Sequence, residues 1–250
     1  MNLIEIRSTM SLIDDVLILA DNVNEFGVDQ AVNNTGCKKQ IVASTLGRLT
    51  SKGLLKKKVA NKQSQYSITN FGRQRINSIL ENIKLYNFKS STNSSWQIVI
   101  FDIPEKIRST RDTFRNSLIK FGFGKLQDSI WVSYHNQTSL LDELLDSLKI
   151  QDRVNIIFTS KISVADEKLL INKINWDWTD INSQYKIFIA EASKFLANKN
   201  KDSFNAKRLV FNFAKSMQKD PKLPGNLQPK NALTQKAYSI YLKIRPYCYS

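Results

Sequence analysis

The sequence predicts an α+β fold made of three successive segments, and three patterns carry this prediction. Residues 1–89 pass through helical stretches and end in a strand–turn–strand. Residues 96–174 alternate strands with helices, and residues 175–250 are mainly helical with interrupting prolines. Element order restricts the fold class, because apolar faces can be packed in few layer arrangements. We therefore expect three domains with these boundaries, the first two joined by a Ser/Thr/Asn-rich linker at residues 90–95.

The first segment has apolar residues at helical spacing. Residues 11–22 predict one helix, residues 24–36 a short one that Gly36 ends, and residues 37–55 a longer one that Gly53 closes. The apolar positions of this third helix are 41, 42, 46 and 49. A strand, a polar turn at Asn61–Ser64 and an alternating strand follow. Three helices and then a hairpin are the order of a winged helix-turn-helix domain.

The charge of the chain favours a polyanionic partner. Lysine and arginine number 37 against 22 aspartates and glutamates, which gives a formal charge of +15 and a sequence pI of about 9.7. Such a protein attracts nucleic acid at ordinary salt concentrations. The alternative is a basic, solvated surface without a specific partner. In a winged helix the third helix enters the major groove, so its polar side chains should contact bases and phosphates.

The predicted DNA-binding residues lie on this helix and at the tip of the hairpin. Residues 41, 44, 45 and 48 share one side of the helix, and we expect Ile41 to mark the edge where that side meets the core. Hairpin tips suit phosphate or minor-groove contacts. A helix that only packs, or a protein-docking module, is the alternative. The predicted contacts are Lys38, Lys39, Gln40, Ser44, Thr45, Arg48, Lys58, Asn61, Lys62, Gln63 and Ser64.

Several functional classes lack the residues they need. Cys37 and Cys248 are the only cysteines and His135 is the only histidine, so the chain offers no disulfide framework and no metal-ligand spacing. It has no glycine-rich phosphate loop, no apolar run of about 20 residues and no signal-peptide pattern. We therefore expect a cytoplasmic protein that is not an enzyme, with no cofactor, no metal and no membrane partner.

The middle segment predicts a ferredoxin-like sheet. A strand at 96–103 ends at Pro104, and a helix at 105–123, a strand at 125–135, a helix at 137–150 and a strand at 152–162 follow. The order β-α-β-(β)-α-β at this length is typical of that fold.

Asp102, at the end of the first of these strands, allows two interpretations. It is a metal-binding carboxylate of a nuclease or an acid that supports its neighbours. Arg108, Arg111 and Arg115 follow at i, i+3 and i+7, and they can reach back to the strand end. A carboxylate beside guanidinium groups is more often salt-bridged than metal-bound, so we expect a supporting role. The same arginine row offers a site for an anionic effector such as an acyl-CoA.

Motifs in the middle and C-terminal segments resemble the PaaX-type transcriptional repressors. "FDIP", "RSTRDTFRNSLIKFGFGKLQDSIWVS", "WDW", "DPKLPGNLQP" and "AYSIYLKI" occur in the family's order. The middle domain of these repressors is similar to the small ferredoxin-like nuclease of CRISPR systems, in which an acid at the position of Asp102 binds Mg²⁺. A tryptophan common after the last proline is absent here, where "KNAL" stands.

The resemblance implies a homodimeric repressor that binds double-stranded DNA and is released by a small-molecule effector such as an acyl-CoA. Its ferredoxin-like domain would pair two chains. Two alternatives remain open: a metal-dependent nuclease that uses Asp102, and a nucleic-acid-binding accessory subunit of a CRISPR-type defence system.

Overall fold

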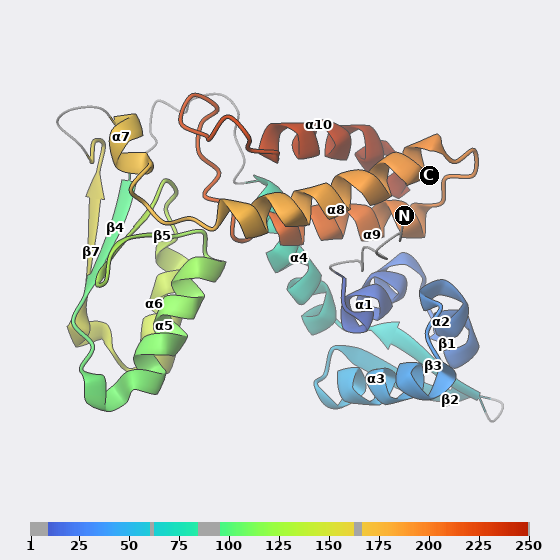
Figure 1. Ribbon diagram of the computed structural model, residues 1–250. Coiled ribbons are helices and arrows are strands. Elements are labelled where there is room, and N and C mark those ends of the chain that lie inside the picture. Colours follow the sequence, from blue (N-terminus) through green and yellow to red (C-terminus); the bar gives the residue numbers. More distant parts are fainter. Residues whose placement is uncertain (1–9, 61–62, 85–95, 163–166, 250) are drawn as a thin grey trace. The chain divides into compact units, whose positions relative to one another are not determined.

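The computed structural model describes residues 10–60, 63–84, 96–162 and 167–249 (Figure 1). The chain packs into two compact units. The first unit comprises Met1–Asn82, Ser183–Lys215 and Lys236–Ser250, and the second comprises Ile83–Asn182 and Ser216–Gln235. Residues 175–250, which we expected to form one domain, are thus divided between the two units.

The first unit begins with three helices and a three-stranded antiparallel sheet of order β1-β3-β2. Helix α4 (Asn70–Lys84) follows the hairpin. The three helices and the hairpin occur in the predicted order, but β1 was not predicted and lies within the helix expected at 24–36, and β3 already starts at Gln63, inside the predicted turn. The preceding elements are α1 (Leu12–Asn22), β1 (Phe26–Gly27), α2 (Val28–Thr35), α3 (Lys39–Ser51), β2 (Leu55–Ala60) and β3 (Gln63–Ile68).

Local sequence signals fix the helix ends in this region. Ser11 and Asp14 form a capping box at the start of α1, in which each side chain bonds the other residue's backbone N–H. Gly36 and Gly53 follow α2 and α3 with φ angles of 65° and 69°, a left-handed conformation that favours glycine. The helix stops predicted at these two glycines are confirmed.

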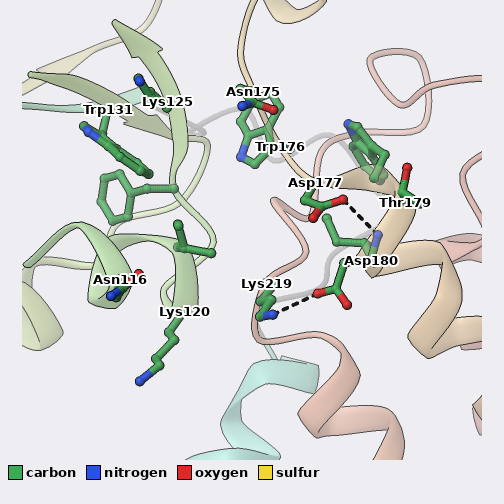
Figure 2. A pocket seen from close by; sticks show the side chains of 14 residues that line it. Asn116, Lys120, Lys125, Trp131, Asn175, Trp176, Asp177, Thr179, Asp180 and Lys219 are labelled. Carbon is green, nitrogen blue, oxygen red and sulfur yellow. Dashed lines mark hydrogen bonds and ion pairs between the residues drawn. The ribbon is translucent and has the colours of Figure 1, made fainter. Parts of the chain in front are cut away.

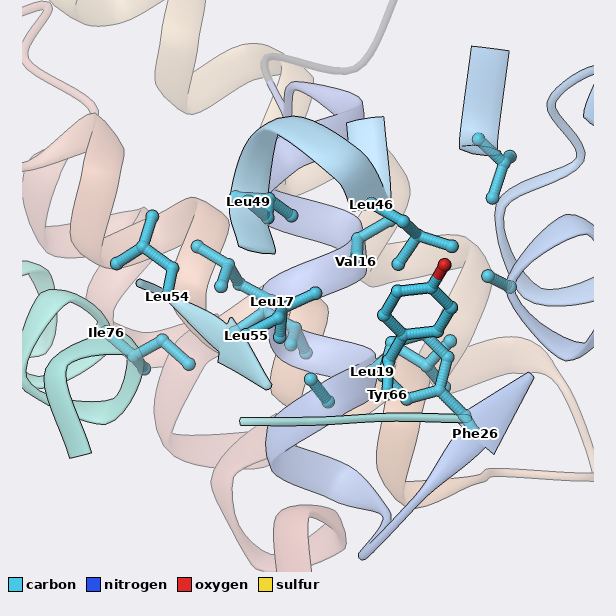
Figure 3. Packing of buried hydrophobic residues seen from close by; sticks show 14 of the residues in the cluster. Val16, Leu17, Leu19, Phe26, Leu46, Leu49, Leu54, Leu55, Tyr66 and Ile76 are labelled. Atoms are coloured by element: carbon cyan, nitrogen blue, oxygen red, sulfur yellow. The ribbon is translucent and has the colours of Figure 1, made fainter. Parts of the chain in front are cut away.

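The core of the first unit joins the N-terminal helices to the hairpin (Figure 3). Val16 and Leu17 of α1 lie among Leu46 and Leu49 of α3, and Leu55 of β2 is buried with them. Phe204 and Phe211, from a much later helix, belong to the same core. The N-terminal segment is therefore packed together with part of the C-terminal third.

Three C-terminal helices complete the first unit: α8 (Trp178–Ala197) from Ser183 onward, α9 (Ser203–Ser216) up to Lys215, and α10 (Thr234–Ile244) from Lys236 onward. Phe213 of α9 lies at their centre. Its ring contacts those of Tyr185 and Phe188 in α8, and it stacks on Tyr241 of α10 at a centroid distance of 5.0 Å. Aromatic contacts of this kind add to the free energy of apolar burial.

Two ion pairs tie α9 to α1. Lys215 Nζ lies 2.7 Å from the Asp14 carboxylate, and Arg208 Nε lies 2.5 Å from that of Asp15. Both aspartates are buried. Burial raises the pKa of Asp14, but hydrogen bonds from Lys215 and Ser11 outweigh it and hold the pKa below its usual value. For Asp15, burial outweighs the effect of Arg208 and raises the pKa.

The second unit contains an antiparallel sheet of order β5-β6-β4-β7, as the ferredoxin-like prediction expects. Helices α5 and α6 cover one face of this sheet (Figure 1). Phe101, Phe114 and Leu141 are among the buried residues between the layers. The elements are β4 (Trp96–Phe101), a 3-10 turn (Glu105–Ile107), α5 (Arg108–Lys120), β5 (Gly124–Gln127), β6 (Ile130–Ser133), α6 (Thr138–Leu148), a 3-10 turn (Gln151–Arg153), β7 (Val154–Thr159) and α7 (Glu167–Ile171).

The segment 216–235 packs into the second unit around buried polar groups. Asp220 accepts hydrogen bonds from the backbone N–H of Lys222 and from the hydroxyl of Thr234. The ring of His135 lies 3.1 Å from the carbonyl oxygen of Lys222. Burial lowers the pKa of Lys222 to about 8, against the attraction of Asp220, and burial also lowers the pKa of His135. In the described part of the chain, no helix has the length and apolar composition that a membrane crossing requires.

Candidate nucleic-acid interface

Helix α3 is amphipathic: one face packs into the core, and the opposite face is exposed to solvent. Val42, Thr45, Leu46 and Leu49 are buried, a spacing of i, i+3, i+4 and i+7. Thr45 is 0% exposed and cannot contact DNA, whereas Ile41 is 51% exposed. Residues 41, 44 and 48 of the predicted side are exposed, whereas the placement of Thr45 on that side is wrong, because Thr45 belongs to the buried face.

The remaining predicted residues of α3 lie at the surface. Lys38 is the residue before the helix and has no ion pair among the described residues. Lys39 pairs with Asp29 of α2 at 2.7 Å, with both side chains largely exposed. Arg48 donates a hydrogen bond to the Thr45 hydroxyl at 3.2 Å, which holds its guanidinium against the helix. Gln40 and Ser44 are exposed as well.

The hairpin brings further cations to this unit. Lys56, Lys57 and Lys58 of β2 are all exposed. At the tip, Gln63 is exposed and Ser64 is half-buried, while the predicted contacts Asn61 and Lys62 lie outside the described residues. Lys56 and Lys57 were absent from the predicted contacts. Their exposure in consecutive positions of β2 makes them candidates as well.

The positive charge of the chain is concentrated in the first unit. That unit has 21 lysines and arginines against 9 aspartates and glutamates, a formal charge of +12, and the second has 16 against 13, a charge of +3. The excess of cations therefore belongs to the unit that contains α3 and the hairpin. Attraction to a phosphate backbone depends on this excess.

The arginine row of α5 is engaged with neighbours other than Asp102. Arg111 pairs with Glu105 at 2.6 Å, a hydrogen bond that lowers the pKa of that carboxyl. Arg108 lies 3.6 Å from Asp112. Arg115 donates to the carbonyl oxygen of Asp128 and lies over the ring of Phe101.

Asp102 is exposed, and its side chain has no ion pair or hydrogen bond among the described residues; only its backbone N–H bonds the carbonyl of Arg153. The expectation that arginines hold Asp102 in a salt bridge is therefore wrong, because those arginines find closer partners. Within the described residues, no three or more His, Cys, Asp or Glu side chains gather in a group that could hold a metal ion.

The second unit also contains a pocket of about 870 Å³ (Figure 2). Trp131, Trp176 and Trp178 contribute to its walls. Trp176 is fixed by a hydrogen bond to the Gly122 carbonyl, and its ring lies where a side chain at Gly124 would be. Sequence analysis did not predict this pocket, because periodicity does not show which buried rings border a cavity.

Most charged groups at the rim of this pocket are neutralised by close partners. Lys219 pairs with Asp180 at 2.8 Å, and Asp177 accepts the backbone N–H of Asp180 (Figure 2). Lys125 pairs with Asp128 at 2.6 Å. Lys120 is the lining lysine without an ion pair among the described residues. Arg108, Arg111 and Arg115, the predicted effector-binding residues, do not line this pocket.

Comparisons with known proteins agree with this architecture. The profile of the "PaaX protein central Cas2-like domain" matches residues 89–171, and that of the "PaaX-like protein C-terminal domain" matches residues 176–249. A solved structure, the uncharacterized protein Rv0674 from Mycobacterium tuberculosis, aligns over 89% of this chain and 86% of its own, with a TM-score of 0.57 and 16% identity, and shows the same fold. No curated protein matches the sequence. With both domains matched in order over more than half of its length, the chain belongs to the PaaX family, whose members are known as regulators.

Proposed function

We propose that this protein is a DNA-binding transcriptional regulator, a homodimeric repressor whose N-terminal winged helix-turn-helix inserts α3 into the major groove. The concentration of positive charge in the first unit carries this proposal, +12 against +3 in the second unit. The exposed side of α3 presents Lys38, Lys39 and Arg48, and β2 adds three exposed lysines. Cations on a helix and an adjacent hairpin suit simultaneous contact with a groove and the flanking phosphates.

Binding as a homodimer follows from how such domains reach useful affinity. A single winged helix makes few contacts, and two copies linked in one dimer bind two half-sites of an inverted repeat with multiplied affinity. The second unit, with its small net charge, is the part suited to hold the two chains together. Its ferredoxin-like sheet is the proposed dimerisation module.

An effector would release DNA by binding the conformation that cannot span both half-sites. We propose a small molecule such as an acyl-CoA and two candidate sites. One is the predicted row of Arg108, Arg111 and Arg115, although Glu105 and Asp112 already occupy two of its guanidinium groups. The other is the tryptophan-lined pocket, which has space for a drug-sized ligand and, at its rim, Lys120, which has no ion pair within the part of the chain that the structure describes.

The DNA-binding proposal is tested by the salt dependence of binding. Genomic fragments retained by the protein supply a duplex, and fluorescence anisotropy measures its affinity from low to high salt. Replacing Lys38, Lys39 and Arg48 together by alanine should reduce the slope of log affinity against log salt by about 3, since each lost phosphate contact reduces it by about 0.9. Lys106, Lys161 and Lys173, three exposed lysines of the second unit, give a matched triple-alanine control that should keep the wild-type slope.

An unchanged slope in the first triple variant would refute the role of α3. The nuclease alternative predicts cleavage of the same duplex instead of binding alone. Strands would be cut when Mg²⁺ or Mn²⁺ is added, and Asp102→Ala would abolish the cutting. Calorimetry with an acyl-CoA distinguishes the two effector sites, because Arg108→Ala with Arg111→Ala disables one site and Lys120→Ala with Trp178→Ala disables the other.

A further inference from the structure

The two edges of the sheet in the second unit differ in protection. At the β5 edge, Lys125 and Asn175 exchange backbone hydrogen bonds of 3.3 and 2.8 Å, and the register shifts between Lys125 and Gln127. A bridging segment and an irregular register both prevent another strand from pairing there. The opposite edge is β7, whose only strand partner among the described residues is β4. In the described ranges, one edge is thus closed and the other is open.

The composition of β7 lacks the usual protection of an open edge. The strand reads Val-Asn-Ile-Ile-Phe-Thr, without a charge, a proline or a glycine. Ile157 is 44% exposed and Phe158 is 48% exposed, although adjacent side chains point to opposite faces of the sheet. Natural proteins place charged residues, prolines or bulges in such strands, because an unprotected apolar edge pairs with other strands. This edge is therefore suited to pairing.

The hydrogen bonds to β4 show which backbone groups of β7 face outward. The Asp102 N–H donates to the Arg153 carbonyl at 3.0 Å, and the register from Trp96–Thr159 to Phe101–Val154 is unbroken. Antiparallel ladders alternate, so every second residue after Arg153 bonds to β4. The N–H and C=O groups of Val154, Ile156 and Phe158 consequently point to the open edge. Among the described residues, none of them has a hydrogen-bond partner there.

We propose that β7 pairs antiparallel with β7 of a second copy of this chain, which joins two four-stranded sheets into one continuous sheet. The inference rests on the proposed function in one respect: a regulator that reads an inverted repeat needs two copies. Pairing of a strand with itself about a two-fold axis is self-complementary. This pairing would supply hydrogen-bond partners for the outward N–H and C=O groups of β7 and would also cover the side chains of Ile157 and Phe158.

Charge selects the second copy as partner and also selects the register. With the axis at Ile156, Val154 lies opposite Phe158 of the partner subunit, and the charged residues that flank the strand face neutral ones. Asp152 then lies opposite Ser160, Arg153 opposite Thr159 and Lys161 opposite Gln151. An axis at Ile157 would place Arg153 opposite Lys161, which is destabilising. The register centred on Ile156 is the one we propose.

Sedimentation velocity without DNA tests the pairing. The wild-type protein should sediment at twice the chain mass of 28.7 kDa, and Ile157→Lys with Phe158→Lys should sediment as a single chain. Leu169 and Leu242 are also exposed apolar residues, so Leu169→Lys with Leu242→Lys is the matched control and should remain dimeric. Tryptophan fluorescence, which reports on the second unit, shows whether each variant is folded.

A folded edge variant that stays dimeric would overturn the proposal, and so would a wild-type protein that is monomeric at all concentrations. The register is tested by Val154→Cys with Phe158→Cys. Mild oxidation should link this variant covalently into dimers, whereas wild type and Phe158→Cys alone should stay unlinked. A dimer that fails to cross-link would refute this register. Because none of these measurements contains DNA, their failure is distinguishable from a failure of the DNA-binding proposal.

Discussion

The two units of this protein differ in how they use charge. The first unit has a net charge of +12, and its buried acids Asp14 and Asp15 are paired with Lys215 and Arg208 of α9. The second unit has a net charge of +3, pairs most of the charged groups around its pocket, and contains all four tryptophans. The excess of positive charge lies in the first unit, and the sheet with its β7 edge and the aromatic pocket lie in the second. This difference is the basis of the two proposals, DNA binding by the first unit and pairing of two chains by the second.

Of the variants considered, Phe213→Ala should cause the largest difference in stability between the two units. Phe213 is fully buried among aromatic rings of α8 and α10, and phenylalanine-to-alanine changes in such cores cost about 3–5 kcal/mol. The loss should be confined to the first unit. Hydrogen exchange measured by mass spectrometry should become faster in α1 and α9 and stay unchanged in β4 and α5.

Phe114→Ala is the matched change in the second unit, since Phe114 is also fully buried. It should speed exchange in β4 and α5 and lower the urea midpoint seen by tryptophan fluorescence. Equal acceleration of both units by either variant would show that they unfold together, and the division into two units would then not describe stability.

Lys222 should make the stability of the second unit depend on alkaline pH. Its pKa is lowered from 10.5 to about 8 by burial, whereas the unfolded chain keeps the ordinary value. Between these two values the unfolded state binds more protons than the folded state, so the stability rises with pH. The rise should reach up to about 3 kcal/mol between pH 8 and pH 10.5, since one pKa unit corresponds to about 1.4 kcal/mol.

Lys222→Met should remove this rise and stabilise the second unit at pH 7, because a buried charge is no longer required. Urea titrations followed by tryptophan fluorescence at several pH values measure both effects. Lys230→Met, at an exposed position, is the control that should keep the wild-type pH dependence. Identical curves for Lys222→Met and wild type would contradict the burial of a charged amine.

Asp14→Asn should destabilise the first unit by about 1–3 kcal/mol at pH 7, because Lys215 loses its carboxylate partner in a mostly buried site. The folded pKa of Asp14 is below 3.8, so its contribution is present above that pH and is lost as the pH falls through the folded value. Thermal unfolding followed by circular dichroism measures the change.

Asp180→Asn breaks the more exposed pair with Lys219 in the second unit and should cost less than about 1 kcal/mol. If Asp180→Asn lost more free energy of unfolding than Asp14→Asn, the buried pair of the first unit would not be the more important of the two.

The parts of this fold that sequence predicts are those set by neighbours along the chain. Apolar periodicity and the stops at Gly36 and Gly53 located the helices, alternation located the second strand of the hairpin, and an apolar run that Pro104 ends located the strand at 96–103. The pairing of Asp14 with Lys215 joins residues far apart in the sequence, and no local pattern indicates it. For that reason the joining of α8, α9 and α10 to the N-terminal helices was not anticipated.

The candidate interface shows the same limit at the scale of single residues. Most predicted residues of α3 are exposed, but Thr45 is buried and Ile41 is not. The apolar side chain of Ile41 was expected at the edge of the core, and the polar side chain of Thr45 at the surface, but the packing of α3 buries Thr45 and leaves Ile41 exposed. At Asp102 the spacing of the arginines was correct, but spacing alone could not show that Glu105, Asp112 and the Asp128 carbonyl would engage them first.

The smallest expected effect distinguishes DNA affinity from stability within the first unit. Asp29 pairs with Lys39 at 2.7 Å, but both side chains are more than 60% exposed, and such surface pairs contribute at most about 1 kcal/mol. Asp29→Asn should therefore leave the unfolding midpoint nearly unchanged. Yet it removes a negative charge beside α3 and frees Lys39 for a phosphate, so duplex affinity should increase several-fold at low salt and less at high salt. Asp202→Asn, at the residue before α9 of the same unit, removes one negative charge far from α3 in the sequence and should change affinity less. If the two variants gain equally, net charge attracts the duplex and the position of Lys39 has no special role.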